Sequence, residues 1–332
     1  MGVIDLLPHP DLVLTLVALG FAAGVDLFWV VFLLAVAARV SWLAPAPGDL
    51  VEMGTVPILL FSAVLHTAER CAEALPSVAL FWHSAQAVAR PIAGALLAAA
   101  IVPGGVVQAT GAAAAGAVLA ATGHRVVWGL DLRRWLDGGR SPGPVLAGLA
   151  EDVVVAGLVV LVLERPEAGG VLVVLVLGAL LLRGRFLLDL SRFGLHLVWG
   201  SVQRLTGRWG WRRQDELPAW VRDALERERR PGNRDRAPLR GLPVGVTGSP
   251  GHHGFRWGWL AGAPDRTFLV LRERGRARAL PVLPGGAPGR SDLFDRLPAR
   301  AGEAECELLV ARDGPDVDAL AAELASRGRV GA

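Results

Sequence analysis

The sequence contains no lysine, and it has only two cysteines and two methionines. Every basic side chain is therefore an arginine, and we interpret the missing lysine as compositional bias rather than as a functional signal. Cys71 lies in apolar sequence and Cys306 in the polar C-terminal part, so no Cys-x-x-Cys spacing exists and a mutual disulfide is disfavoured. We predict no metal site and no cofactor.

The chain also lacks a nucleophile motif, a metal-ligand set and a phosphate-binding loop. We therefore predict no catalytic residue and do not expect an enzyme. The N-terminal segment, MGVIDLLPHPDLVL, lacks the basic region and the small-residue cleavage site of a signal peptide. We expect the first apolar run to be retained as a membrane anchor.

Long apolar runs dominate the first half of the chain. Of the 332 residues, 52% are apolar, and the mean hydropathy of +0.43 is too high for an ordinary soluble protein. The runs predict an all-α bundle of about six transmembrane helices, one kinked at Pro91, followed by a small soluble α+β domain. The third span is either one kinked helix or an interfacial helix joined to a short one. The predicted spans are 12–40, 57–75, 77–102, 105–122, 144–163 and 170–182.

The first span carries two features that we interpret further. Gly20 and Gly24 form a small-xxx-small pattern, which lets a neighbouring helix approach closely, and Asp26 follows near the middle of the run. One interpretation is a tight helix crossing with Asp26 facing a neighbour. The other is a helix break at Gly24, with Asp26 lining a cavity.

Charged side chains within apolar sequence mark the candidate site, because a charge in lipid is costly unless it is paired or hydrated. One interpretation is a belt of ion pairs that keeps the helices in register. The other is an anion or proton path, in which Arg90 suits a phosphate or carboxylate and, if paired, contacts Glu151 or Asp152. The candidate cluster is Asp26, Glu69, Arg90, Arg125, Glu151 and Asp152.

The distribution of arginine predicts the orientation. The segment 124–140 and the stretch after Leu182 are rich in arginine, so both should be cytoplasmic. With six spans, the N-terminus and the C-terminus then both lie in the cytoplasm. We predict a multi-pass protein of the inner (plasma) membrane.

The composition of the chain changes twice after the last predicted span. We divide the chain into a transmembrane domain (1–183), an interfacial amphipathic helix with a charged linker helix (184–240) and a soluble α+β domain (241–332). In that last domain we predict a core around Trp257 and Trp259, and we assign His252 and His253 no role. The predicted strands are 243–246, 254–260, 267–273, 276–282 and 305–311, followed by a helix over 317–327.

The run ERCAEALPSVALFWHSAQAVARPIAGALLAA, the later Ser-Pro and the segment LAEDVVVAGLVVL carry a family resemblance over roughly residues 12–190. Together they resemble the bacterial multi-pass membrane family named domain of unknown function 4126. Ala79 and His83 stand where the family pattern has acids, and no Asn-Thr precedes Ser141. The resemblance implies a membrane bundle and a bacterial origin, and it implies no activity. The matching positions are Glu69, Pro76, Arg90, Pro91, Ser141, Pro142, Glu151 and Asp152.

Two functions follow as hypotheses. The first is a membrane protein that binds or transports a small anionic or lipid-phosphate ligand, with a tail that regulates it or recruits a protein partner. The second is a scaffold without transport, whose charges serve packing alone. The expected partners are the lipid bilayer, an anionic ligand or lipid, and a protein at the C-terminal domain. Nucleic acid is not expected, because Glu226 and Glu228 alternate with arginines and no aromatic residues are interleaved. The sequence leaves the oligomeric state open.

Overall fold

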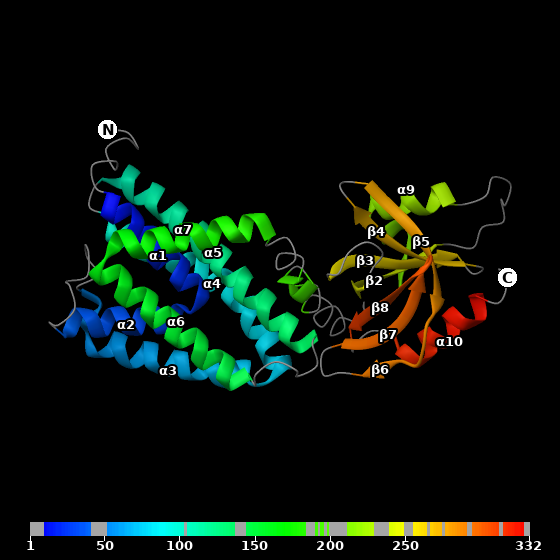
Figure 1. Cartoon of the computed structure of the whole chain (residues 1–332), viewed down its shortest axis with the longest axis horizontal. Helices are drawn as coiled ribbons and strands as arrows, with labels where there is room; N and C mark the ends of the chain where they lie inside the picture. Colours follow the sequence, from blue (N-terminus) through cyan, green and yellow to red (C-terminus); the bar gives the residue numbers. More distant parts are fainter. Residues whose placement is uncertain are drawn as a thin grey trace. The chain divides into compact units, whose positions relative to one another are not determined.

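The computed structural model describes residues 10–40, 52–102, 105–136, 144–183, 190, 191, 193–195, 198, 211–228, 239–248, 255–263, 266–273, 276–290, 294–311 and 315–328. It divides into two compact units, Met1–Ser191 and Arg192–Ala332. The first unit is helical and the second is rich in β-strands (Figure 1). The predicted interfacial helix lies largely outside the described residues, as do His252 and His253.

Consecutive helices of the helical unit from α3 to α7 alternate in direction, so α3, α5 and α7 begin at the same end of the unit (Figure 1). This is the usual outcome where helices are joined by short connections. The helices are α1 (Pro10–Val25), α2 (Leu27–Arg39), α3 (Val56–Glu73), α4 (Pro76–Ile101), α5 (Val106–Leu136), α6 (Pro144–Glu164) and α7 (Pro166–Arg183).

The first predicted span, 12–40, is not one helix. Asp26 has an extended backbone (φ −146°, ψ 96°) and separates α1, with 16 residues, from α2, with 13. At 1.5 Å per residue these helices are about 24 Å and about 20 Å long, and each is shorter than the roughly 30 Å hydrocarbon core of a bilayer. The expectation of a single crossing helix here is therefore wrong. The alternative of a break is correct in kind, but the break lies at Asp26 rather than at Gly24, and a cavity lined by Asp26 stays a prediction.

Both outer ends of this helix pair lie at the same end of the unit (Figure 1). Leu14 in α1 lies against Gly170, near the start of α7. At the end of α2, Arg39 donates from Nη1 to the backbone oxygen of Gly54, just before α3 begins (3.2 Å). The chain thus enters along α1, turns at Asp26 and returns along α2, so the turn lies inside the unit.

Small residues bring the helices of the unit close together. A Cβ on Gly24 would lie 2.2 Å from the backbone oxygen of Ala120 in α5, and a Cβ on Gly116 would lie 2.2 Å from that of Gly94 in α4. Neither glycine can carry a side chain without moving backbone. The small-residue pattern in α1 and the Ala/Gly-rich α5 therefore act as close helix contacts, as the sequence predicts.

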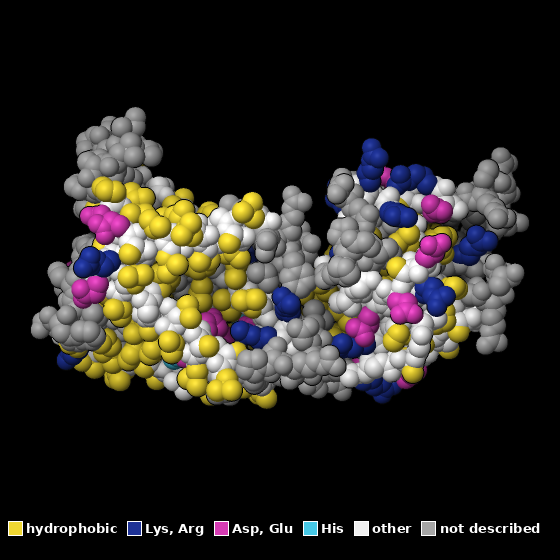
Figure 2. Space-filling model, viewed as in Figure 1, with side chains coloured by type: hydrophobic (Ala, Val, Ile, Leu, Met, Phe, Trp, Pro, Cys, Tyr) yellow, Lys and Arg dark blue, Asp and Glu magenta, His cyan; other side chains and the backbone are white. Residues whose placement is uncertain are grey.

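The outer faces of the helical unit are apolar. Large exposed hydrophobic side chains lie on α3 to α7, whereas Val13 is the one such residue described within α1 and α2. The face seen in Figure 2 is covered mostly by hydrophobic side chains. Three helical stretches, Val78–Ile101, Val106–Arg134 and Leu146–Glu164, are long and apolar enough to cross a membrane. The unit therefore has membrane-spanning helices.

Two further predicted spans can be compared with the structure. The predicted second span corresponds to α3, whose last two turns carry Glu69, Arg70 and Glu73, and α3 is not among the three apolar stretches. The third span is one continuous helix, α4, which runs through Pro91, so the alternative of one helix is correct and that of two joined helices is wrong. A proline inside a helix removes one backbone hydrogen bond, and packing on α1 and α5 keeps the helix intact.

The β-rich unit, predicted as a small α+β domain, is built around a closed barrel. Six antiparallel strands form a ring, because β8 pairs with both β7 and β2. Closure leaves no exposed sheet edge. The strands are β2 (Arg240–Thr247), β3 (Arg256–Ala263), β4 (Arg266–Glu273), β5 (Arg276–Pro284), β7 (Phe294–Ala301) and β8 (Ala304–Ala311), with short β1 (Arg212–Arg213) beside β2 and β6 (Gly289–Arg290) beside β7.

Helices cover two sides of this barrel (Figure 1). α10 (Val317–Gly328) inserts Leu320 and Leu324 into the core that fills the barrel. α9 (Ala219–Glu228), preceded by a 3-10 turn (Gln214–Glu216), covers Trp259 on the outer surface. The predicted charged helix thus belongs to this unit. Trp259 is buried as expected, whereas Trp257 is only half-buried, beside Phe193 at 5.7 Å between ring centroids.

The five predicted strands correspond to β2, β3, β4, β5 and β8, and β7 was not predicted. The sequence of β7, FDRLPARA, contains Pro298 and three charged residues, so its pattern resembles a loop. Proline has no backbone N–H to donate, so a strand tolerates it where no donor is needed. The carbonyl of Pro298 accepts a hydrogen bond from the backbone N–H of Gly285 (2.9 Å).

Candidate functional site

The helix break places two helix ends inside the helical unit, and charged side chains satisfy both. Asp26 caps the N-terminus of α2 by accepting a hydrogen bond from the backbone N–H of Trp29 (3.0 Å). Arg90 in α4 donates to the free carbonyls of Gly24 and Val25 at the C-terminus of α1, both at 2.7 Å. Each charge has the sign that the dipole of its helix end favours.

Arg90 is fully buried and has one ionic partner among the described residues. Its Nη2 donates to Glu69 Oε1 in α3 at 2.7 Å. The same oxygen accepts from the indole N–H of Trp82 (3.1 Å). The expected pairing of Arg90 with Glu151 or Asp152 is therefore wrong, because Glu69 and the α1 carbonyls occupy its guanidinium.

Arg70 in α3 joins the largest number of acids. Its Nη2 donates to Asp26 Oδ2 and to Asp152 Oδ1, the latter at 2.5 Å. Its Nη1 donates to Glu73 Oε2 at 2.6 Å and lies 3.8 Å from Glu151 Oε2. One guanidinium thus links α3, α6 and the helix break.

His66, one turn before Arg70, faces the same two aspartates. Its Nδ1 lies 3.4 Å from Asp26 Oδ2, and its Nε2 lies 3.6 Å from Asp152 Oδ2. The imidazole stacks on Trp29 with 4.9 Å between ring centroids and 23° between planes. Trp29 is held in place by donating from Nε1 to the backbone oxygen of Asp152 (2.9 Å). Asp26 and Asp152 are therefore each approached by an arginine and a histidine.

The network is acidic overall. Five carboxylates and two guanidinium groups give a formal charge of −3 with neutral His66 and −2 with His66 protonated. The carboxylates are Asp26, Glu69, Glu73, Glu151 and Asp152, and the cations are Arg70 and Arg90.

Burial divides this network into an inner and an outer part. Asp26, Glu69 and Arg90 are almost completely buried. The side chains of the outer groups on α3 and α6 keep between 13% and 21% of their surface exposed. The network therefore runs from partly exposed side chains on α3 and α6 to the buried Asp26. The outer groups are His66, Arg70, Glu73, Glu151 and Asp152.

A second polar cluster lies between α4 and α5. The ring of buried His83 packs parallel to Trp128 (5.9 Å, 15°), and its Nε2 lies 3.3 Å from Asp131 Oδ2. Asp131 also pairs with Arg134 at 2.5 Å. His124 Nε2 contacts the backbone oxygen of His83 (2.8 Å). This cluster ties α4 to α5 through polar contacts inside an otherwise small-residue interface.

Asp26, His66 and Asp152 have donor atoms within 4.8 Å of one another, which is close enough to hold a metal ion. Arg70 already bonds both of these carboxylates through Nη2. A metal ion there would have to displace the guanidinium of Arg70. The arrangement therefore fits that arginine, a cation supplied by the protein itself, better than a resident metal ion.

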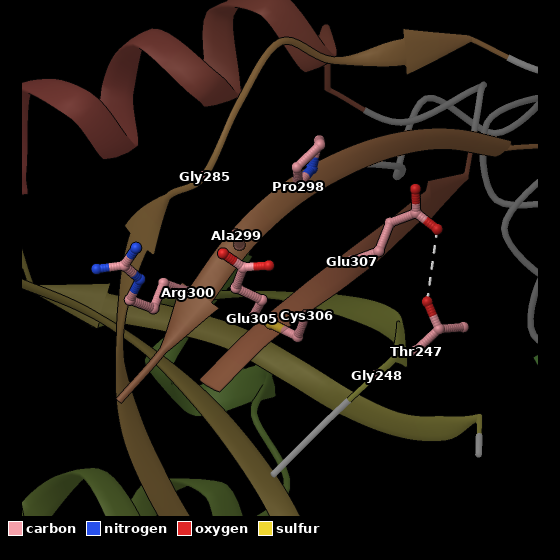
Figure 3. A pocket seen from close by; sticks show the side chains of 9 residues that line it. All are labelled: Thr247, Gly248, Gly285, Pro298, Ala299, Arg300, Glu305, Cys306 and Glu307. Atoms are coloured by element: carbon pink, nitrogen blue, oxygen red, sulfur yellow. Dashed lines mark hydrogen bonds between the residues drawn. The ribbon is translucent and has the colours of Figure 1, made fainter. Parts of the chain in front are cut away.

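The β-rich unit contains a separate pocket of about 320 Å³ at the ends of β2, β7 and β8. Thr247 donates to Glu307 at 3.5 Å on one side of it, and Arg300 and Glu305 lie toward the other side (Figure 3). Burial raises the pKa of the Cys306 thiol in its wall to about 11, so this cysteine stays protonated at neutral pH.

Five of the six sequence-predicted site residues belong to the network at the helix break: Asp26, Glu69, Arg90, Glu151 and Asp152. Arg125 does not, because its side chain is exposed on α5. The prediction left out Arg70, which is central, and His66. A signal for both was available, since His66, Arg70 and Glu73 recur at spacings of four and three residues and therefore lie on one face of α3.

Comparison with protein-family models matches residues 13–184 to the family described as Domain of unknown function (DUF4126). The region after the match has no family assigned. No curated protein matches the chain. The family match includes α1 to α7 almost entirely and extends over more than half of the chain. The chain therefore belongs to the family described as Domain of unknown function (DUF4126).

Proposed function

We propose that this protein is a multi-pass membrane protein that moves a small cation across the bilayer by way of the helix break. The observation that carries the proposal is the buried Asp26, which lies between α1 and α2 and is linked through Arg70 to partly exposed acids on α3 and α6. Interrupted helices whose ends meet near the bilayer midplane are a recurring way to build ion sites in transporters. An intramembrane carboxylate is costly and is by default a functional candidate.

The location of the break supports this proposal. The break lies beside the middle of three helices: Arg90 in α4 bonds the carbonyls of Gly24 and Val25, Ala120 in α5 lies against Gly24, and Asp152 in α6 shares Arg70 with Asp26. If α3 to α7 each cross the bilayer, these residues lie near its midplane. The apolar outer faces of α3 and α7 support their inclusion as spans, with Leu60, Phe61, Leu172 and Leu175 all exposed.

The sign of the ligand follows from the charge of the site. The expectation of an anionic or lipid-phosphate ligand rests on Arg90, whose guanidinium is occupied by Glu69 and two carbonyls. Arg70 is surrounded by four carboxylates. A net negative site attracts cations and repels anions, so we propose a cation in place of the anion.

The helix pair also changes the proposed orientation. Arg133, Arg134 and Arg183 lie at the ends of α5 and α7, which share one end of the unit. By the positive-inside rule this end faces the cytoplasm. Five crossings then place Pro10 on the opposite side, unlike the cytoplasmic N-terminus expected from six spans. We propose a regulatory or partner-binding role in the cytoplasm for the β-rich unit.

Proteoliposomes test the proposal directly. Purified full-length protein is reconstituted, and flux of H⁺, Na⁺ and K⁺ is followed with ion-sensitive dyes inside the vesicles. We expect flux of at least one of these ions above that of empty vesicles, and loss of most of it in Asp26→Asn, which keeps an N-cap side chain for α2. Glu164→Gln, an exposed carboxylate at the end of α6, is the matched control and should leave flux unchanged. Equal flux in wild type and Asp26→Asn would reject the proposal.

A further inference from the structure

We propose that the cation is the proton and that His66 carries it between Asp152 and Asp26. This inference rests on the proposed cation path and identifies its substrate. Its basis is geometric: the two ring nitrogens of one imidazole face two different carboxylates, Nδ1 toward Asp26 and Nε2 toward Asp152. An imidazole can accept a proton on one nitrogen and release another from the second, so this placement suits a relay.

The exposure of the three groups gives the relay an entrance and an inner end. The side chains of Asp152 and His66 are 15% and 13% exposed, whereas that of Asp26 is 1% exposed. A proton that reaches the partly exposed Asp152 on α6 thus has one titratable ring between it and the buried Asp26.

The transfer balances without any co-reactant. Neutral His66 carries its proton on Nδ1 and accepts a second on Nε2 from the carboxylic acid of Asp152, whose O–H bond breaks. The imidazolium then releases the Nδ1 proton to the Asp26 carboxylate. One transfer leaves the ring as the Nε2–H tautomer, so loss of that proton and uptake of one on Nδ1 must precede the next transfer. The two nitrogen–oxygen gaps of 3.4 Å and 3.6 Å close by small side-chain movements, as catalytic hydrogen bonds commonly do.

The charges around His66 suit an imidazole that both binds a proton and releases it. Asp26 at the break and Asp152 on α6 place negative charge beside the ring, and Arg70 on α3 places positive charge beside the same two carboxylates. From α2, the face of Trp29 stacks on the ring, and an aromatic face attracts a cation. These are the charged groups and the aromatic ring that face His66 within the described part of the unit.

Arg70 explains why protons fit this site better than alkali ions. Its Nη2 already bonds one oxygen of Asp26 and one of Asp152. An alkali ion needs several oxygen ligands, so it would have to remove the guanidinium, whereas a proton needs only one lone pair.

Trp29 provides a readout that does not depend on transport. A protonated imidazole stacked on an indole quenches its fluorescence, so the difference between wild type and Trp29→Phe isolates the signal of Trp29. In detergent we expect this difference signal to fall with decreasing pH in one step between about pH 8 and 5. The step should vanish in His66→Gln. In Asp152→Asn its midpoint should move to lower pH, because a carboxylate that stabilises the imidazolium is lost.

The flux measurement completes the test. We expect His66→Gln to lower proton flux at least about tenfold, with Glu164→Gln as the unchanged control. A pH step that persists in His66→Gln, or proton flux at the wild-type rate in that variant, would overturn the relay. Flux of Na⁺ or K⁺ that survives His66→Gln would overturn the relay but leave the cation path standing. Flux of no ion, with the fluorescence step present, would overturn the cation path and show that His66 only titrates.

Discussion

The two units of this protein differ in which side chains they bury and which they expose. In the helical unit Asp26, Glu69 and Arg90 are buried while large hydrophobic side chains face outward. In the β-rich unit the hydrophobic residues fill the barrel, and the surface in Figure 2 carries arginines and acids. A unit surrounded by lipid gains nothing by hiding leucine, because lipid tails are as apolar as leucine. A unit surrounded by water gains stability from every apolar side chain it buries.

The two units also satisfy their backbones differently. The barrel closes on itself, so every strand of the ring has two neighbours and no edge remains. In the helical unit, the backbone between α1 and α2 leaves its helices at residues 24 to 26, where Asp26 and Arg90 replace the missing partners. Buried charges thus support the irregular backbone at this break.

The largest effect is expected from removing Arg90. Arg90→Ala leaves Glu69 as an uncompensated buried charge and frees the carbonyls of Gly24 and Val25, so it should cost about 3–5 kcal/mol of unfolding free energy. The exposed pair of Arg290 and Asp318 in the β-rich unit is the control, and Arg290→Ala should cost less than about 1 kcal/mol. Denaturant unfolding in detergent measures both. Similar costs for the two variants would contradict the contrast between the units.

Leucine truncations should show the opposite contrast. Leu297→Ala opens a cavity in the barrel and should cost about 2–5 kcal/mol. Leu175→Ala on the apolar outer face of α7, where the side chain is 66% exposed, removes contacts with lipid or detergent and should cost well under about 1 kcal/mol. Thermal unfolding, followed by the tryptophans of each unit, distinguishes the two. An equal loss of stability in both variants would mean that α7 is packed against protein.

A double-mutant cycle sharpens the assignment of partners. Glu69→Gln and Arg90→Gln should be non-additive by about 0.5–3 kcal/mol, because the two side chains are in direct contact. The same cycle on Arg90 and Glu151 should be additive within about 0.5 kcal/mol if these two residues share no contact. Coupling to Glu151 with additivity at Glu69 would restore the pairing expected from the sequence.

The smallest effect concerns Cys306. Because burial raises its pKa to about 11, the thiol should remain protonated and resist alkylation from pH 7 to 9. Its reactivity should rise only as the pH approaches 11, where the thiolate forms. Iodoacetamide labelling of a Cys71→Ser variant, read by mass spectrometry, measures this, with the urea-unfolded protein as the control. Rapid labelling of the folded protein at pH 8 would contradict the burial of Cys306.

Much of the site could be predicted from sequence because charge within apolar sequence has few stable solutions. Asp26, Glu69, Arg90 and Glu151 were candidates on that ground alone, and they meet in the structure. Arg125 has the same composition signal but lies on an exposed part of α5, and residue type alone cannot distinguish the two faces of a helix.

The pairing within the site was not predictable in the same way. Which carboxylate each arginine meets depends on the turn at Asp26, and a single straight helix through 12–40 would bring different side chains together. The barrel strand β7 was missed for a related reason. Pro298 and its charged neighbours resemble a loop, and only pairing with β8 along the whole strand makes them a strand.

The number of membrane crossings tests most directly whether the chain turns back inside the membrane at Asp26. Reporters that are active on only one side of the membrane are fused to full-length protein, before Met1 in one fusion and after Ala332 in another. A turn at Asp26 followed by five crossings predicts that the two fusions report opposite sides, with the one after Ala332 in the cytoplasm. Two fusions that report the same side would require an even number of crossings and would contradict the re-entrant pair.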